Sequence, residues 1–251
     1  MDFISGEIIG IDKPLGWTSF DAVKRIRGAI QRRLQVKKFK VGHAGTLDPL
    51  ATGVLIICTG RSTKRIDELQ SGDKEYVATL RIGATTPSFD LETEIDREMP
   101  WEHITREDVV RILPQFTGRI MQVPPVFSAV KIDGKRAYSF ARKGKDVELK
   151  AKPLEIKELE LLDFQPPSLT IRIVCTKGTY IRALARDLGE SLGCGAHLTA
   201  LRRTRVGKVR IEDCLQVNEA VEKIATAELT FPDDYQQPTT NTQQHKSSSQ
   251  E

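Results

Sequence analysis

Two hydrophobic periodicities alternate along the chain and predict its elements. Residues 74–83 alternate apolar and polar side chains, as a strand with one buried face does. Residues 18–34 instead repeat apolar side chains at helical spacing, after the helix-start pair Thr18 and Asp21. This order of many strands with scattered helices is compatible with an α+β fold. Further strands are predicted over 6–12, 54–58, 118–123, 154–164, 169–175 and 195–204, a hairpin with an Asp133-Gly134 turn over 130–138, and further helices over 63–69, 105–116, 137–143 and 217–227 and from Thr179 onward.

The stretch over residues 40–60, KVGHAGTLDPLATGVLIICTG, is the most tightly patterned part of the chain. Its four glycines and Pro49 mark a sharply shaped backbone that leads into the strand over 54–58. Asp48 is the one acid in this stretch, and no other charge follows Lys40. An acid held at the mouth of a rigid strand is a candidate for chemistry, although a lone acid in a glycine-rich loop is more often a turn cap.

Positive charge is segregated along the chain, although the net charge of +4 is modest. Two stretches of the chain contain basic residues and no acid, and the second of these runs contains Arg202, Arg203, Arg205, Lys208 and Arg210. Such runs suit a polyanion bound to one face, while a solvated helix face explains either run alone. The first run, between Asp21 and Asp48, has no acid and eight basic residues, namely Lys24, Arg25, Arg27, Arg32, Arg33, Lys37, Lys38 and Lys40.

Length and composition permit a soluble enzyme and exclude several classes of protein. A chain of 251 residues can form one large domain or two small ones. The four cysteines have no CxxC or Cys/His ligand spacing, so reduced thiols and no metal are expected. No apolar run approaches the roughly 20 residues that cross a bilayer. No secretory signal is evident, so no membrane is expected as a partner and the cytoplasm is the expected compartment.

Several sequence blocks carry a family resemblance. The eleven residues HAGTLDPLATG, from His43 to Gly53, resemble the active-site motif of the TruB-type tRNA pseudouridine synthases. Other blocks keep the order of that family, and they are KPLGWTSFDAV from Lys13, KEYVA from Lys74, KGTYIRALARDLG from Lys177 and GAHLTALRRT from Gly195. The resemblance implies the pseudouridine synthase fold, a mixed, largely antiparallel sheet with flanking helices.

The resemblance also implies an activity, the isomerisation of the T-loop uridine numbered 55 in tRNA. This reaction breaks the bond from base N1 to the sugar, rotates the uracil and joins C5 to the same carbon. Nothing is oxidised and nothing leaves, so no cofactor and no metal are expected. The implied partner is the T-arm stem-loop of tRNA, with no protein partner required. The target base must be extruded before it can react.

Asp48, Tyr76 and Arg182 are the implied catalytic residues. Asp48 either attacks the anomeric carbon or removes the neighbouring sugar proton. Arg182 falls in the first turn of the helix predicted from Thr179, where a cation opposes the helix dipole and needs a nearby anion. Asp48 is the expected anion. Tyr76 is implied to stack on the flipped base and can also act as a general base, whereas periodicity alone makes it a core aromatic residue.

Four further residues receive binding or positioning roles from the resemblance. Tyr180 and Leu201 are expected to wall the uracil pocket, although Leu201 would otherwise be an ordinary core residue. His43 is expected to fill the space that the extruded base leaves and to stack on neighbouring bases, although a loop histidine more often caps a turn. Lys13 is either a solvated turn lysine or a positioning residue beside the catalytic loop.

Residues 1–232 are expected to form the catalytic domain, and residues 233–251 a disordered polar tail. Only 41 residues follow Arg210, so the small C-terminal RNA-binding domain that is usual in the family is not evident. Two other functions stay open on sequence alone. One is a non-catalytic tRNA-binding or folding factor, and the other is a relative that acts on other RNA with partner proteins.

Overall fold

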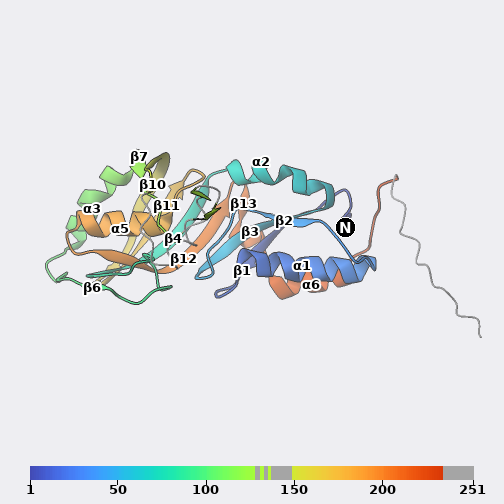
Figure 1. Cartoon of the computed structure of the whole chain (residues 1–251), viewed down its shortest axis with the longest axis horizontal. Helices are drawn as coiled ribbons and strands as arrows, with labels where there is room; N and C mark the ends of the chain where they lie inside the picture. The colour runs from blue at the N-terminus through green and yellow to red at the C-terminus, as the bar shows by residue number, and fades with distance from the viewer. Residues whose placement is uncertain (128–130, 133–134, 137–148, 234–251) are drawn as a thin grey trace, which may run out of the picture.

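The computed structural model describes residues 1–127, 131–132, 135–136 and 149–233. A ten-stranded sheet runs the length of the molecule (Figure 1). Along the sheet the strands follow the order β14, β1, β3, β12, β4, β11, β10 and β7, with β2 beside β3 and β13 beside β12. The strands are β1 (Ile8–Lys13), β2 (Val41–Ala44), β3 (Ala51–Thr59), β4 (Lys74–Ile82), β7 (Gly118–Gln122), β10 (Lys152–Gln165), β11 (Ser168–Cys175), β12 (Ala196–Val206), β13 (Val209–Arg210) and β14 (Leu215–Gln216).

Most neighbouring strands of this sheet are antiparallel. The pairs β1 with β14 and β3 with β12 are parallel. The predicted mixed, largely antiparallel sheet is therefore confirmed. Two short pairs lie apart from it, β5 (Ala84–Thr85) with β6 (Arg97–Glu98) and β8 (Lys131–Ile132) with β9 (Lys135–Arg136). The second pair forms the arms of the predicted hairpin, whose Asp133-Gly134 turn lies outside the described residues, as does the helix predicted over 137–143.

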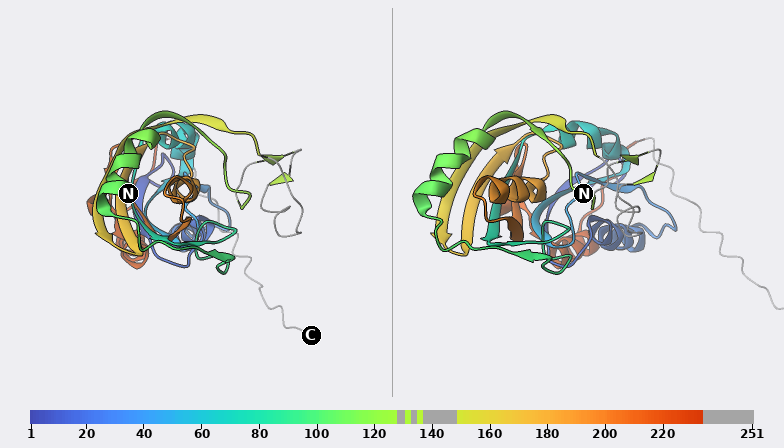
Figure 2. Two further views of the ribbon diagram at one scale, coloured as in Figure 1. Left: turned by 90° about the vertical axis from the view of Figure 1, so that its left-hand side faces the viewer. Right: turned by 60° about the vertical axis from the view of Figure 1, so that its left-hand side comes forward.

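Helices cover the sheet at both ends of the molecule. Figure 1 shows α1 and α6 side by side near β1 and β3, and Figure 2 shows the sheet curving around α5. One apolar core lies between α1, α6, β1 and β3, and another between α5, α3 and strands β4, β10, β11 and β12. The helices are α1 (Ser19–Leu34), η1 (Gly60–Arg65), α2 (Ile66–Ser71), α3 (Arg106–Ile112), η2 (Leu113–Phe116), α5 (Ile181–Ser191), η3 (Ile211–Asp213) and α6 (Val217–Thr226).

Local signals explain where several elements begin and end. Thr18 and Asp21 form a reciprocal capping box at the start of α1, as predicted. The helix predicted through residue 116 instead changes to a 3-10 turn after α3, because Pro114 has no amide hydrogen to continue the α-helical ladder. The helix predicted from Thr179 begins at Ile181, two residues later. Within the described part of the chain, no helix is long and apolar enough to span a bilayer.

Two strands approach closely at the middle of the sheet. Strand β12 lies between β3 and β4, where Arg203 pairs with Gly53 on one side and with Tyr76 on the other. Gly53 has φ +102, and a Cβ atom there would lie 2.1 Å from the carbonyl oxygen of Arg203. Only glycine satisfies both conditions. The glycine that ends the HAGTLDPLATG block therefore allows β12 to seat against β3.

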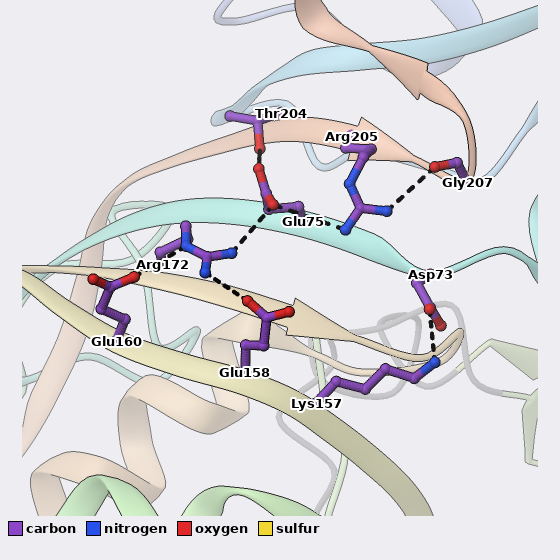
Figure 3. Close-up of polar contacts among 9 residues, drawn as sticks. All are labelled: Asp73, Glu75, Lys157, Glu158, Glu160, Arg172, Thr204, Arg205 and Gly207. Carbon is purple, nitrogen blue, oxygen red and sulfur yellow. Dashed lines mark hydrogen bonds and ion pairs between the residues drawn. The ribbon is translucent and has the colours of Figure 1, made fainter.

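The sheet face opposite Tyr76 carries a cluster of ion pairs (Figure 3). Because successive residues of a strand point to opposite faces, Glu75 of β4 points away from Tyr76. Arg172 of β11 lies at the centre and pairs with three carboxylates, including that of Glu75. This outer-face cluster joins β4, β10, β11 and β12 and comprises Glu75, Glu158, Glu160, Arg172, Thr204 and Arg205.

Candidate active site

A cavity of about 290 Å³ opens beside the middle of the sheet. Its wall combines the loop after β2, strand β4, the loop before α5 and strand β12. Segments far apart in the chain therefore meet at one hollow. The sequence-predicted site residues that line it are Asp48, Tyr76, Tyr180, Arg182 and Leu201.

Asp48 and Arg182 form an ion pair in the wall of this cavity. Arg182 Nη2 lies 3.0 Å from Asp48 Oδ2, as expected from the sequence. The Arg182 side chain is 6% exposed, whereas that of Asp48 is 44% exposed, so the carboxylate is open to a ligand and is not enclosed by its loop. The guanidinium is thus a fixed cation that holds an accessible anion.

Arg182 is itself held on several sides. Its Nη1 donates to the carbonyl oxygen of Ser88 at 3.2 Å, and its Nη2 donates to that of Phe127 at 2.8 Å. Its Nε lies 3.7 Å from the carboxylate of Asp90, whose side chain is 9% exposed. These acceptors offset the cost of placing a buried cation in the first turn of α5.

Asp90 takes part in this arrangement but is not among the site residues predicted from the sequence. It begins an acidic stretch in a loop, and no local spacing connects it with Arg182, which lies 92 residues later in the chain. The available signal was the partial resemblance of residues 85–90 to a segment of the TruB-type family, from which this sequence departs. Only the packing of this loop on α5 reveals that Arg182 lies between two carboxylates.

Tyr76 contributes a buried ring to the cavity. It is 8% exposed and lines the cavity, so its ring belongs both to the core and to the cavity wall. Burial raises the pKa of the Tyr76 phenol above its ordinary value, although the guanidinium of Arg203 acts in the opposite direction through charge and hydrogen bonding. The phenol is therefore protonated at neutral pH, which favours a ring for stacking over a phenolate base.

Tyr180 and Leu201 lie on the cavity wall as expected. Tyr180 is the residue immediately before α5. Its backbone is fixed by Gln122, whose side chain accepts a hydrogen bond from the Tyr180 N–H at 2.9 Å and donates one to its carbonyl at 3.2 Å. Leu201 lies on β12 in register with Ala51 and Ala78. Both residues thus sit on ordered backbone.

His43 and Lys13 are not among the residues that line the cavity. His43 is half-buried on β2, in register with Ile57. Burial lowers the pKa of His43, and the charge of Arg203 adds to this effect, so its imidazole is neutral at pH 7. Its ring is therefore uncharged.

Lys13 is fully buried and is not a solvated turn lysine. Its Nζ donates to the carbonyl oxygens of Trp17 at 2.7 Å, Pro14 at 2.9 Å and Pro49 at 3.5 Å. The last of these follows Asp48 directly. Burial lowers the pKa of Lys13 to about 8. Lys13 thus lies behind the loop that carries Asp48.

The second basic run is largely occupied by contacts within the protein. Arg203 is 2% exposed. Arg202 pairs with Asp12 at 2.8 Å, and Arg205 lies 3.8 Å from Glu75. The first run instead lines an open groove along α1 with Lys24, Arg25, Arg27 and Arg32. Among the described residues, no group of three or more His, Cys, Asp or Glu side chains is arranged to hold a metal.

The chain matches known family models and curated proteins over most of its length. Residues 31–181 match the model of the TruB family pseudouridylate synthase N-terminal domain, and residues 182–235 match the tRNA pseudouridylate synthase B C-terminal domain. The chain is 65% identical over 229 residues to a tRNA pseudouridine synthase B of Phocaeicola vulgatus, which covers 91% of this chain and 97% of the relative. A protein of the same name from Bacteroides thetaiotaomicron is 61% identical over 238 residues, covering 93% and 99%.

Solved structures give the same fold. A chain in a crystal structure of a Cbf5-Nop10-Gar1 complex superimposes with a TM-score of 0.65 at 28% identity, over 88% of this chain and 55% of that one. A chain in an archaeal box H/ACA sRNP Nop10-Cbf5 complex gives 0.61 at 26% identity, over 86% and 53%. This chain therefore spans about half the length of those solved chains.

The family model and the relatives agree on one class of enzyme, the pseudouridine synthases, which are RNA-uridine isomerases. Within that class, the chain belongs to the TruB family. The C-terminal family model begins inside α5, and the residues it matches include β12, the central strand beside β3 and β4. The family's C-terminal segment is thus represented here, but as part of the main sheet. No separate C-terminal domain occurs within the described residues.

Proposed function

We propose that this chain isomerises uridine 55 in the T-loop of tRNA, and that Asp48, Arg182 and Tyr76 perform the chemistry. The ion pair of Asp48 with Arg182, in the wall of a cavity that Tyr76 also lines, is the observation that supports these roles. An exposed carboxylate held beside a buried cation is suited to act on a sugar carbon or its neighbouring proton. The buried ring offers a stacking face for uracil.

The reaction balances without any added group. The bond from N1 to the sugar breaks, and its electron pair stays with the uracil while Asp48 meets the positive charge that develops at the sugar. The uracil rotates against Tyr76, Tyr180 and Leu201, and C5 then joins the same sugar carbon. The proton that C5 loses is matched by one gained at N1. The choice between attack and proton removal is testable, because only the second route breaks the bond from the sugar C2′ to its hydrogen and therefore shows a primary deuterium isotope effect there.

RNA binding is assigned to the basic face of α1. The N-terminal end of this helix contacts the catalytic loop, because Ser19 Oγ accepts a hydrogen bond from the Leu47 N–H at 2.8 Å and donates one to its carbonyl at 3.1 Å. From this contact, the groove with Lys24, Arg25 and Arg32 leads away along α1. Phosphates bound there would fix the register of the T-arm without reading its sequence.

His43 is proposed to occupy the space of the extruded base. A neutral, half-buried ring can stack on unpaired bases without a desolvated charge. Lys13 is proposed to position the catalytic loop through Pro49.

The substrate and the compartment are proposed from the relatives. The chain spans these relatives almost completely, and they carry the name of a tRNA enzyme. Their name supports tRNA as the substrate, without a protein partner, and the cytoplasm, where tRNA is used, as the compartment. Residues 1–232 are proposed as one catalytic unit, because β12, β14 and α6 all join the same sheet or its core.

The deciding experiment compares Asp48→Asn with wild type on an unmodified tRNA transcript. Pseudouridine at each position is mapped chemically, and binding is measured separately. We expect the variant to bind tRNA within about threefold of wild type and to form no detectable pseudouridine, because the amide keeps the shape of the side chain and removes its charge. Asp163→Asn, at an exposed position of β10, serves as the control. Turnover near the wild-type rate would refute the catalytic role of Asp48, and modification at another uridine would refute the substrate assignment.

A further inference from the structure

Arg203 is a buried cation at the centre of the sheet. It is 2% exposed and is among the largest fully buried side chains of the described residues. On β12 it lies in register with Gly53 of β3 and with Tyr76 of β4. It therefore sits between the strand that follows the catalytic loop and the strand that carries the stacking ring.

The guanidinium of Arg203 donates three hydrogen bonds, two to the catalytic loop and one to strand β3. Its Nη2 donates to the carbonyl oxygen of Gly45 at 3.1 Å and its Nη1 to that of Thr46 at 3.3 Å. Its Nε donates to the carbonyl oxygen of Val54 at 2.8 Å, within β3. The fork thus joins the residues before Asp48 to the strand that follows it. A lysine ammonium has no planar fork and cannot reproduce this arrangement.

The whole catalytic turn is held in the same manner. The carbonyl of Asp48 accepts from the Ala51 N–H at 3.1 Å, and that of Pro49 accepts from the Gly16 N–H at 2.9 Å. Together with the bonds from Arg203 and from Ser19 to the preceding carbonyls, each carbonyl from residue 45 to residue 49 has a donor. Among these donors, Arg203 is the one whose side chain also faces Tyr76 and lines the cavity.

Stability alone does not account for this residue. Burying a guanidinium costs desolvation energy, and an apolar side chain of similar volume fills a core position without that cost. The acceptors of Arg203 are the backbone carbonyls of Gly45, Thr46 and Val54, and an apolar residue in its place would remove a donor from each of them. The chain thus places a costly group where it fixes the relative position of Asp48 and Tyr76.

We propose that Arg203 is a positioning residue of the pseudouridine synthase reaction, which holds the Asp48 turn and the Tyr76 ring in a fixed relation across β12. The inference rests on the proposed function. Arg203 touches neither the sugar nor the base in this role, and acts through the backbone of the turn and through the side chain of Tyr76. Its loss therefore slows the chemical step and leaves RNA affinity in place.

The test measures single-turnover pseudouridine formation and tRNA affinity separately for Arg203→Lys, which keeps the charge and removes the fork. We expect the rate to fall roughly 30-fold or more, with the dissociation constant within about threefold of wild type, at a temperature where the variant is folded by circular dichroism. A purely structural role predicts lower thermal stability with an unchanged rate for folded enzyme. That result would overturn the inference. If Arg203→Lys does not accumulate as folded protein, Arg203→Met, whose unbranched chain fills the same space, takes its place in the same assay.

A double variant tests the link to Tyr76. If Arg203 acts partly through the Tyr76 hydroxyl, Arg203→Lys costs less rate in a Tyr76→Phe background than in the wild type, and full multiplication of the two losses contradicts the link. Arg172→Met in the outer-face cluster is the matched control, because it removes a multiply bonded arginine from the opposite face of the same sheet. Wild type must be active on tRNA and Asp48→Asn inactive. An inactive wild type or an active Asp48→Asn variant counts against the proposed function. If both controls behave as expected and Arg203→Lys is still active, the result counts against the positioning role alone.

Discussion

Replacing Arg182 by methionine separates the chemical and structural effects of one buried cation. At the 3.0 Å separation of Arg182 Nη2 from Asp48 Oδ2, two unit charges attract by roughly 5 kcal/mol at an effective dielectric constant of about 20. The Asp48 side chain is 44% exposed, so water screens about half of this attraction and leaves on the order of 2 to 3 kcal/mol. Loss of that stabilisation from the transition state corresponds to a rate reduction of roughly 30- to 150-fold.

The same substitution also leaves Asp90 without its cation. The Asp90 side chain is only 9% exposed, and removing one partner of a buried pair costs about 3 kcal/mol of folding free energy. Adding Asp90→Asn removes the orphaned charge. We therefore expect Arg182→Met to lose both stability and rate, and the double variant to regain most of the stability while the rate stays low.

Urea denaturation and single-turnover pseudouridine formation on an unmodified tRNA transcript measure the two effects. Arg172→Met is the control, since its carboxylate partners on the outer face of the sheet are mostly exposed and such pairs contribute about 1 kcal/mol or less. Its rate should equal that of wild type. A folded Arg182→Met enzyme with a rate within threefold of wild type would refute the reasoning, and so would recovery of the rate in the double variant.

Two further predictions concern charge. Because the pKa of Lys13 is about 8 when folded against an ordinary 10.5, the unfolded chain binds more protons between these values and stability rises with pH there. Lys13→Met should remove up to about 1.4 kcal/mol per pH unit of this rise between pH 8 and pH 9, and an unchanged slope in urea denaturation would contradict it. Binding of tRNA should weaken steeply with salt, and replacing both Lys24 and Arg25 by glutamine should reduce the log–log slope by roughly 2. Arg106→Gln on α3 should leave that slope unchanged, and a flat profile for the wild type would count against the α1 groove.

Local patterns predicted the elements that local physics determines. The capping box of Thr18 and Asp21 begins α1 as expected, and the alternation over 74–83 buries one face of β4 throughout. The end of the helix before Phe116 and the start of α5 were wrong by a few residues. Helix ends depend on single backbone bonds that periodicity does not report, such as the one that Pro114 cannot make.

The site was predictable only in part, because its contacts are non-local. Motif resemblance selected Asp48 and Arg182 before their pairing was visible, and the pair is present. Neither composition nor spacing could reveal that Asp90 joins them, or that Arg203 lies buried while its neighbours in the same basic run pair with acids. Arg203 alone of the five basic residues in this run is buried because of the face of β12 on which it lies. That face is determined by the register of β12 with β3 and β4, which the sequence does not show.

The central place of β12 has a consequence for synthesis of the protein. The strands that flank it, β3 and β4, leave the ribosome more than 100 residues before Ala196 does. Until β12 inserts between them, the Asp48 turn lacks its clamp and the edges of both strands are unpaired. A chain that stops before β12 can thus carry the complete HAGTLDPLATG motif and still lack the Arg203 contacts that hold the Asp48 turn.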